Sequence, residues 1–482
     1  MSRRREVVLI AATVVSLSCG LNYLFSAYAP QLAARLRLTS TQTNIVGAAG
    51  NLGVYLSSPF IGRIVDRRGP RSMLILAASA LTAGYLVIRA FYIGGHSRSS
   101  IFSTFGVPGL VLAELLTGIG STAGLSAAGN TVAKAYKKRR AAALSIVLSG
   151  FGLSAFFYST LSSIVLHAGA DAHDSTSDFL LMIAIGCLLS MVVGIFLVRP
   201  AHSASAEPEP QSSTSPSERT PLVNPGSGPS SPEELNVSGW ALFRELDFYL
   251  IFLFNGLCSG VGLCYINNLG TVLRSIAASP SSSVYLHLSP LDLSRSQSHL
   301  VSLLSIFNFL GRLCSGFGSD YLVHHEKEGR RVARVWWMVF TAAVLTTSQV
   351  FALGATEVYG WRGLVLPTVL TGFAHGSLFG VSGIIGLERF GMKNFSGTNG
   401  ILALAPALFG QVTNLIFGRI YDSRSRKISM PKLETQRPGP MCLAGRDCYA
   451  PAFRMTLGMA ATAVLVGIIL ATLRRKMKRR VA

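Results

Sequence analysis

Charged residues are scarce in this sequence, and acidic residues are the scarcest. Only 13% of the 482 residues are Asp, Glu, Lys or Arg, whereas a soluble globular protein carries about 25%. So few charges cannot cover the surface of a soluble chain of this length. Because half of the residues are hydrophobic, we expect a large part of the chain to face lipid.

The sequence also lacks the motifs of common enzymes and of ATP-driven pumps. It contains no Walker loop, no H-E-x-x-H and no nucleophile elbow, and five of its seven cysteines lie in apolar runs without the spacing of metal ligands. We therefore expect no enzyme, no cofactor and no metal. The net charge of +21 comes in short basic clusters between apolar runs, so nucleic acid is not an expected partner.

Twelve apolar runs are long enough to cross a bilayer, which takes about 20 helical residues. They predict an all-α integral membrane protein with twelve transmembrane helices. The runs cover residues 7–29, 44–62, 72–92, 108–131, 141–166, 179–198, 248–273, 296–318, 333–354, 363–387, 396–417 and 452–473.

Residues 199–247 differ from the apolar runs on either side of them. Between Pro200 and Pro232 this segment is rich in Ser and Pro and cannot bury a core, so we predict a disordered linker. The linker separates an N-terminal six-helix bundle, residues 1–198, from a C-terminal one, residues 248–482.

Basic residues gather on one side of the predicted helices, and by the positive-inside rule this side is cytoplasmic. It includes both termini and the linker. The loop at 418–451 is also basic, but an even number of spans places it on the non-cytoplasmic side. Cys442 and Cys448 lie in that loop, where a disulfide could form; two unpaired thiols are the alternative.

A short motif recurs at matching places in the two halves. Asp66 follows the second span and Asp320 the eighth, 254 residues later, which is typical of a duplicated transporter. An Asp there can accept hydrogen bonds from helix N-termini and from arginines. We predict that these loops form a gate; otherwise they merely cap helices at the headgroups. The predicted gating residues are Gly62, Asp66, Arg67, Gly69, Arg71, Gly316 and Asp320.

The loop from Gly62 to Arg71, G-x-x-x-D-R-x-G-x-R, resembles the signature of the major facilitator superfamily. More narrowly, Asn22-Tyr23, Tyr265–Gly270 and Phe390–Phe395 are similar to the nodulin-like branch, with its fungal vacuolar-type monocarboxylate-transporter homologues. The resemblance covers nearly the whole chain. It implies two pseudo-symmetric six-helix bundles that rock about a central solute cavity, lined by spans one, four, seven and ten.

Polar side chains within spans usually face a cavity or a partner helix. Where resembling monocarboxylate transporters hold an acid and an Arg four residues apart, this chain has Asn308 and Arg312, and Gln31 stands in place of a Lys. Arg312 could bind a carboxylate or serve helix packing. Glu114 and His375 could carry a proton or join helices. The predicted cavity residues are Asn22, Tyr23, Tyr28, Glu114, Asn255, Tyr265, Asn267, Asn268, Asn308, Arg312, His375 and Gln411.

We predict a monomeric secondary active transporter of a small solute, such as an organic anion or monocarboxylate, with protons as a candidate coupling ion. The alternative is a receptor or scaffold of transporter fold that moves nothing. In the linker, Glu218, Leu222 and Val223 approximate an acidic dileucine sorting signal that adaptors could bind. This signal favours a vacuolar over a plasma membrane.

Overall fold

The structure is a computed structural model that describes residues 2–95, 101–136, 140–165, 176–198, 239–277, 290–324, 333–391, 395–428, 442 and 444–479. Within these ranges every regular element is a helix. The α-helices are α1 (Ser2–Leu17), α2 (Phe25–Leu36), α3 (Ser40–Arg68), α4 (Pro70–Gly94), α5 (Ile101–Ala135), α6 (Arg140–Val165), α7 (Thr176–Leu197), α8 (Leu246–Ala277), α9 (Pro290–His324), α10 (Ala333–Tyr359), α11 (Val365–Phe390), α12 (Phe395–Leu402), α13 (Leu404–Ile428) and α14 (Ala450–Arg479). The 3₁₀ helices are η1 (Leu21–Leu24), η2 (Gly239–Arg244), η3 (Gly360–Leu364) and η4 (Gly445–Cys448).

Twelve segments of the described chain are long and apolar enough to cross a membrane, so the predicted number of spans is confirmed. Large apolar side chains lie exposed on the outside of the bundle; Phe60, Ile164 and Leu465, for example, are 67%, 69% and 62% exposed. A lipid environment removes the cost of exposing such side chains to water. The chain is therefore an integral, multi-pass membrane protein.

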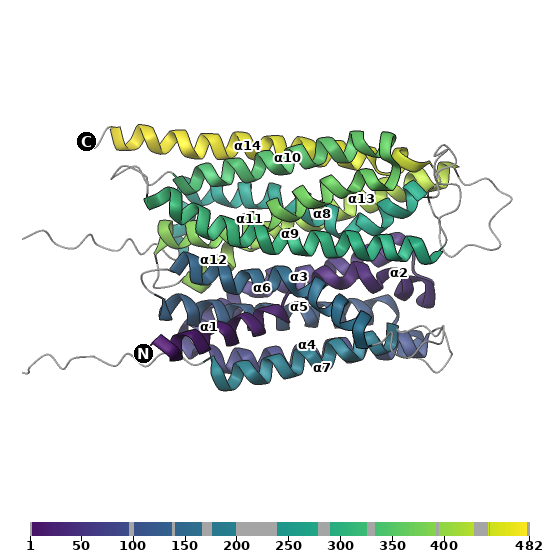
Figure 1. The fold of residues 1–482 in the computed structure, drawn as a ribbon, viewed down its shortest axis with the longest axis horizontal. Coiled ribbons are helices and arrows are strands. Elements are labelled where there is room, and N and C mark those ends of the chain that lie inside the picture. The colour runs from purple at the N-terminus through teal and green to yellow at the C-terminus, as the bar shows by residue number, and fades with distance from the viewer. Residues whose placement is uncertain are drawn as a thin grey trace, which may run out of the picture.

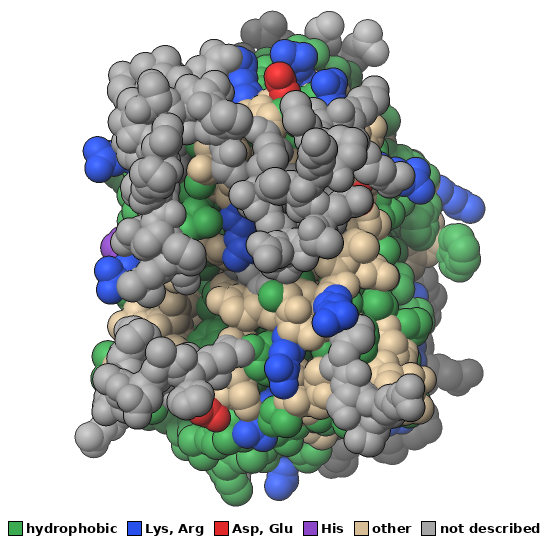
Figure 2. All heavy atoms as spheres, turned by 90° about the vertical axis from the view of Figure 1, so that its right-hand side faces the viewer, with side chains coloured by type: hydrophobic (Ala, Val, Ile, Leu, Met, Phe, Trp, Pro, Cys, Tyr) green, Lys and Arg blue, Asp and Glu red, His purple; other side chains and the backbone are tan. Residues whose placement is uncertain are grey.

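The helices form two groups that lie side by side (Figure 1). Helices α1–α7 make one half and α8–α14 the other, and both chain termini lie at the same end of the bundle, which we call the terminal end. The halves meet along two seams, where α3 packs against α12 and α13, and where α6 packs against α9. Figure 2 views the opposite end, where visible basic side chains outnumber acidic ones.

The first and eleventh spans are interrupted next to residues that line the centre of the bundle, and the fourth is kinked near its start at Gly106. The first breaks between α1 and α2, where Gly20 lies so close to α6 that a Cβ there would be 2.0 Å from the Phe151 carbonyl oxygen. The eleventh, predicted as one run, divides into α12 and α13 around Ala403. Pro406 explains the second break, because it has no N–H to donate to the Leu402 carbonyl one turn earlier.

Two predicted boundaries differ from the structure. The linker was expected to extend to residue 247, but η2 occupies Gly239–Arg244 and α8 starts at Leu246, because Leu242 is buried and the Phe243 ring packs 5.2 Å from that of Phe248. The loop expected from residue 418 begins later, since α13 continues to Ile428. Residues 199–238, with the predicted sorting residues Glu218, Leu222 and Val223, lie outside the described residues.

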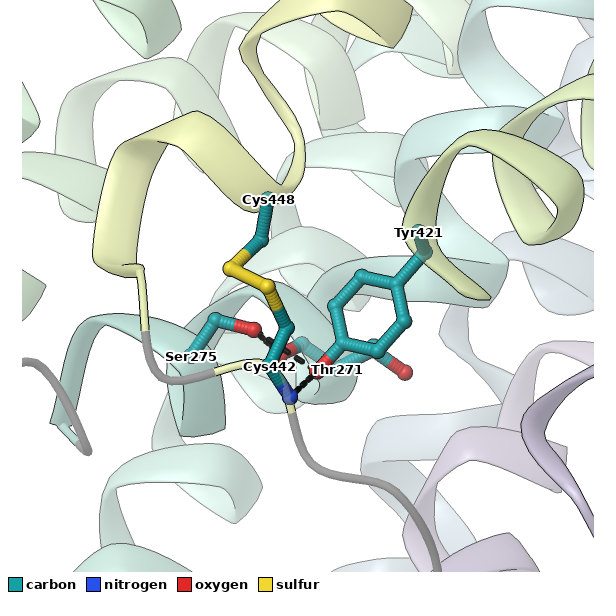
Figure 3. Close-up of a disulfide and its surroundings, with 5 residues drawn as sticks. All are labelled: Thr271, Ser275, Tyr421, Cys442 and Cys448. Carbon is teal, nitrogen blue, oxygen red and sulfur yellow. Dashed lines mark hydrogen bonds between the residues drawn. A yellow bond between two sulfur atoms is a disulfide. The ribbon is translucent and has the colours of Figure 1, made fainter. Parts of the chain in front are cut away.

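Cys442 and Cys448 are joined by a disulfide, with their Cα atoms 6.0 Å apart (Figure 3). The Cys442 N–H donates to the Tyr421 hydroxyl on α13 at 3.3 Å, and the same hydroxyl lies 2.9 Å from Ser275 Oγ on α8. The disulfide thus holds the segment before α14 against α8 and α13 at the opposite end.

Candidate functional site

A cavity of about 150 Å³ lies between the two halves. Engineered cavities of this volume in other proteins hold a benzene molecule, so the space suits a small solute. The first half contributes Tyr23 from η1, Tyr55 from α3 and Phe151 from α6, and the second half contributes Arg312 from α9 and Phe379 from α11. Its polar lining also includes Ser126, Asn130, Asn255, Ser259, Ser396 and Asn399.

Arg312 is the one charged side chain among the described residues that line the cavity. It is 2% exposed, and its guanidinium carbon lies 5.0 Å from the ring centre of Phe151 and 5.6 Å from that of Phe379. Desolvated cation–π contacts of this kind stabilise a cation by about 2 kcal/mol or more. Within the described part of the chain no carboxylate forms an ion pair with Arg312, so the cavity wall carries a positive charge.

Asn308 sets the position of Arg312. Arg312 Nε donates to Asn308 Oδ1 at 2.9 Å, one helical turn away on α9. The amide Nδ2 of Asn308 has no hydrogen-bond partner among the described residues. Asn308 also lies on the seam with α6, because a Cβ added to Gly152 would come within 2.8 Å of its Oδ1. The residue therefore orients the cation without neutralising it.

A hydrogen bond joins the two halves beside the cavity. The Tyr23 hydroxyl lies 3.1 Å from His375 Nε2 on α11, and His375 is 1% exposed. The imidazole packs on Gly262, where an added Cβ would lie 2.2 Å from Nδ1. His375 itself is not part of the cavity wall, so it reaches the cavity through Tyr23.

Asp66 joins the halves at the terminal end. Its Oδ1 accepts from Asn130 Nδ2 at 2.6 Å, and its Oδ2 accepts at 3.0 Å from the backbone N–H of Gly397 in the first turn of α12. Asn130 Nδ2 also donates to Ser396 Oγ at 2.6 Å. Such an N-terminal position favours a carboxylate, because the first N–H groups of a helix have no partner within it.

Two glycines of the segment from Gly62 to Arg71 serve different structural purposes. A Cβ on Gly62 would lie 2.4 Å from the Ser396 carbonyl oxygen, so a glycine is needed for α3 and α12 to approach. Gly69 has φ +82 and joins α3 to α4. Arg67 and Arg71 are exposed, and no ion pair between them and Asp66 occurs in the described ranges. Asp66 thus has an amide and a backbone N–H as partners, not the expected arginines.

The matching loop of the second half makes a different set of contacts. Asp320 accepts from Arg334 Nη2 at 2.6 Å, and Arg334 Nε lies 3.2 Å from the Glu388 carboxylate. Gly316, one turn earlier on α9, accepts from Ser319 Oγ at 3.3 Å. This cluster joins α9, α10 and α11 within one half, whereas Asp66 reaches across to the other.

The opposite end is also held by contacts between the halves. The Thr41 hydroxyl at the start of α3 donates to the Asp422 carboxylate on α13. Further along the same seam, Gln411 Nε2 donates to the Ala48 carbonyl at 2.6 Å. Helix α3 is therefore bonded to the second half near both of its ends.

The cavity gathers only part of the predicted set. Tyr23, Asn255 and Arg312 line it, and Asn308 and His375 contact lining residues. The others do not line it because their helix faces point elsewhere: Tyr265 lies 2.8 Å from Thr368 Oγ1, and Asn268 donates to Asn414, both within the second half. The predicted residues outside the lining are Asn22, Tyr28, Glu114, Tyr265, Asn267, Asn268 and Gln411.

Several lining residues were not predicted. Tyr55, Phe151 and Phe379 are aromatic residues in apolar spans, and their sequence positions carry no sign of the face they occupy. Asn130 and Asn399 are polar residues inside predicted spans, so the rule applied to the other polar residues would have found them.

Comparisons with known proteins agree with this architecture. A family model described as Major Facilitator Superfamily matches residues 9–474. The chain is 24% identical to the "Probable transporter MCH1" of Gibberella zeae over 93% of this chain and 86% of that protein. It is 22% identical to the protein of that name in Saccharomyces cerevisiae, over 87% and 85% of the two chains. The predicted resemblance to monocarboxylate-transporter homologues is confirmed.

Two solved structures share the fold. A bacterial homologue of the human lysosomal transporter Spinster, in an inward-facing and unoccupied conformation, has a TM-score of 0.59 and 16% identity, over 98% of this chain and 97% of that one. The nucleoside transporter NupG has a TM-score of 0.60 and 11% identity, over 96% and 99% of the two chains. At these identities the likeness extends to the fold alone.

Proposed function

Because the chain belongs to the Major Facilitator Superfamily, a family of membrane transporters, we propose that it is a secondary active transporter of a small organic anion. The solute would bind in the cavity between the halves, and the halves would open the cavity to each side of the membrane in turn. The relatives named as probable transporters support the transport function; the organic-anion class rests on the cavity.

The observation that carries the substrate class is the charge of the cavity wall. Arg312 is buried between two aromatic rings, and no carboxylate among the described residues is paired with it. A buried cation without a counter-ion is costly, and a bound carboxylate would remove that cost while accepting two parallel N–H bonds. The apolar and aromatic remainder of the lining favours a short hydrocarbon or ring next to the carboxylate.

The contacts at the two ends support alternating access. Asp66 with α12 at the terminal end, and Thr41 with Asp422 at the other, join the halves through a few polar contacts that can break and re-form. We propose that Asp66 and the loop around it form the gate of the terminal end. Asp320 would stiffen the second half, since its partners lie within that half.

A scaffold that transports nothing is the competing proposal. A solid apolar centre would favour it, whereas this centre contains a cavity whose wall includes polar side chains and a buried cation. A vacuolar membrane address, adaptor binding at the linker, a cytoplasmic position for both termini and a monomeric state stay predictions, as do protons as the coupling ion.

Flux in proteoliposomes tests the proposal. We expect the purified protein to exchange a labelled member of a panel of small monocarboxylates, and Arg312→Gln to lower that exchange at least tenfold. The matched control is Arg454→Gln on α14, which makes the same chemical change at an exposed residue that does not line the cavity. Equal exchange by the Arg312→Gln and Arg454→Gln variants would overturn the role of Arg312, and no flux of any panel member would favour the scaffold.

A further inference from the structure

A second polar cluster lies within the first half, apart from the cavity. Its centre is Glu114 on α5, which is 2% exposed and not part of the cavity wall. The Tyr28 hydroxyl on α2 donates to Glu114 Oε1 at 2.7 Å, and Thr117 Oγ1 lies 3.3 Å from Glu114 Oε2. The acid is thus buried inside one six-helix bundle, in a span of the membrane.

Among the described residues no basic side chain is paired with this carboxyl group. The titratable groups that face it are the phenols of Tyr28 from α2 and Tyr85 from α4, and α3 presents Gly50. In the described part of the chain Glu114 forms no ion pair. An ionised carboxylate buried without a cation is far more costly than a neutral carboxyl group, so this site favours the form that holds a proton.

Asn22 supplies a partner for that proton. Its side chain is 6% exposed, and neither its Oδ1 nor its Nδ2 has a hydrogen-bond partner among the described residues. Both side chains close over Gly50, because a Cβ there would lie 3.2 Å from Glu114 Oε2 and 3.6 Å from Asn22 Cγ. A carboxyl O–H at Oε2 could donate to the amide oxygen of Asn22, which satisfies two buried polar groups at once.

The break in the first span links this cluster to the cavity. Asn22 belongs to η1, and the next residue, Tyr23, lines the cavity and contacts His375 across the halves. Interrupted transmembrane helices commonly place ion and solute sites next to each other. A change of charge at Glu114 would therefore act on the 3₁₀ turn that carries Tyr23.

We propose that Glu114 is the proton-binding site through which this transporter couples solute movement to a pH gradient. The inference rests on the proposed transport of an organic anion. The Glu114 carboxylate takes up one proton from the water on one side of the membrane and becomes a neutral carboxyl group. It releases that proton on the other side, so that a monoanion and a proton cross together without net charge.

Infrared titration tests proton binding without any solute. The purified wild-type protein should show the carbonyl stretch of a protonated carboxyl group, and Glu114→Gln should lose it, whereas the exposed control Glu6→Gln should keep it. Tyr28→Phe should shift the band rather than remove it, because it deletes a hydrogen-bond donor to that group. A band that persists in Glu114→Gln, or is absent from the wild type, would overturn the proposal.

Transport of labelled lactate as the probe separates this proposal from the previous one. Under an inward gradient of one pH unit the wild type and Glu6→Gln should accumulate lactate roughly tenfold, and Glu114→Gln should accumulate none while still exchanging it at equal pH. Exchange without accumulation by the wild type would refute proton coupling but leave transport standing. No exchange at all would count against the transport proposal, and the infrared band would still decide whether Glu114 binds the proton.

Discussion

The gating role of Asp66 can be tested through the two bonds that its carboxylate accepts. Asp66→Ala removes both the contact with Asn130 and the contact with the Gly397 N–H. A hydrogen bond to a charged group contributes about 1.5–3 kcal/mol, and only the Gly397 bond crosses between the halves. Taking about 2 kcal/mol for it, the closed state of the terminal end should lose roughly thirtyfold in population relative to open states.

Two measurements check this shift. Flux in proteoliposomes should fall in Asp66→Ala, while the amount of protein in the membrane stays at the wild-type level. Thiol labelling of Ser126→Cys, a cavity position, should accelerate from the terminal end in the Asp66→Ala background, with the exposed Cys314 replaced by Ser in every protein.

The control is Asp178→Asn, an exposed acid at the start of α7. It should change neither flux nor labelling. If Asp66→Ala labels and transports at the wild-type rate, the contact between Asp66 and α12 is a helix cap at the headgroup level and not a gate.

Three further changes test other parts of the structure. Gly62→Val should part α3 from α12 and lower flux, because its Cβ would collide with the Ser396 carbonyl; Gly458→Val, with open space around its Cα, should leave flux unchanged. Replacing both Cys442 and Cys448 by Ser opens a loop whose closure contributes about 2 kcal/mol to the free energy of unfolding. The midpoint of thermal unfolding should therefore fall by a few degrees, and an unchanged midpoint would contradict this. Asn308→Asp places a carboxylate at the Oδ1 position, 2.9 Å from Arg312 Nε. Because this carboxylate would pair with Arg312, anion binding should weaken about tenfold at neutral pH and recover in acid. An affinity that does not depend on pH would exclude that pairing.

The sequence predicted the spans because each must place about 20 apolar residues in the bilayer. It did not predict the break in the first span, which depends on Gly20 meeting the Phe151 carbonyl on another helix. A long-range contact of this kind leaves no periodic signal in the local sequence. The predicted bounds of the linker and of the loop at 418–451 differ from the structure for a related reason, since Leu242, Tyr421 and Ser425 are buried by packing that the local composition does not indicate.

Site residues of a type that is rare in membrane spans could be predicted from the sequence, whereas site residues of a common type could not. Arg312 could be chosen because a cation in an apolar span is unusual, and Asp66 because its motif recurs. Phe151 and Phe379 hold Arg312 in place, yet they are ordinary residues of a membrane helix. Polar residues such as Tyr265 and Asn268 were assigned to the cavity, but the turns of α8 beyond Asn255 direct them towards α11 and α13.

The breaks in the first and eleventh spans connect these observations. The break in the first span places Asn22 beside Glu114 and Tyr23 at the cavity. The break in the eleventh, at Ala403, follows the short helix α12, whose first turn bonds Asp66 and whose Asn399 lines the same cavity. Under the proposals above, solute at Arg312, a proton at Glu114 and a gate at Asp66 would each act on a segment next to one of these two breaks.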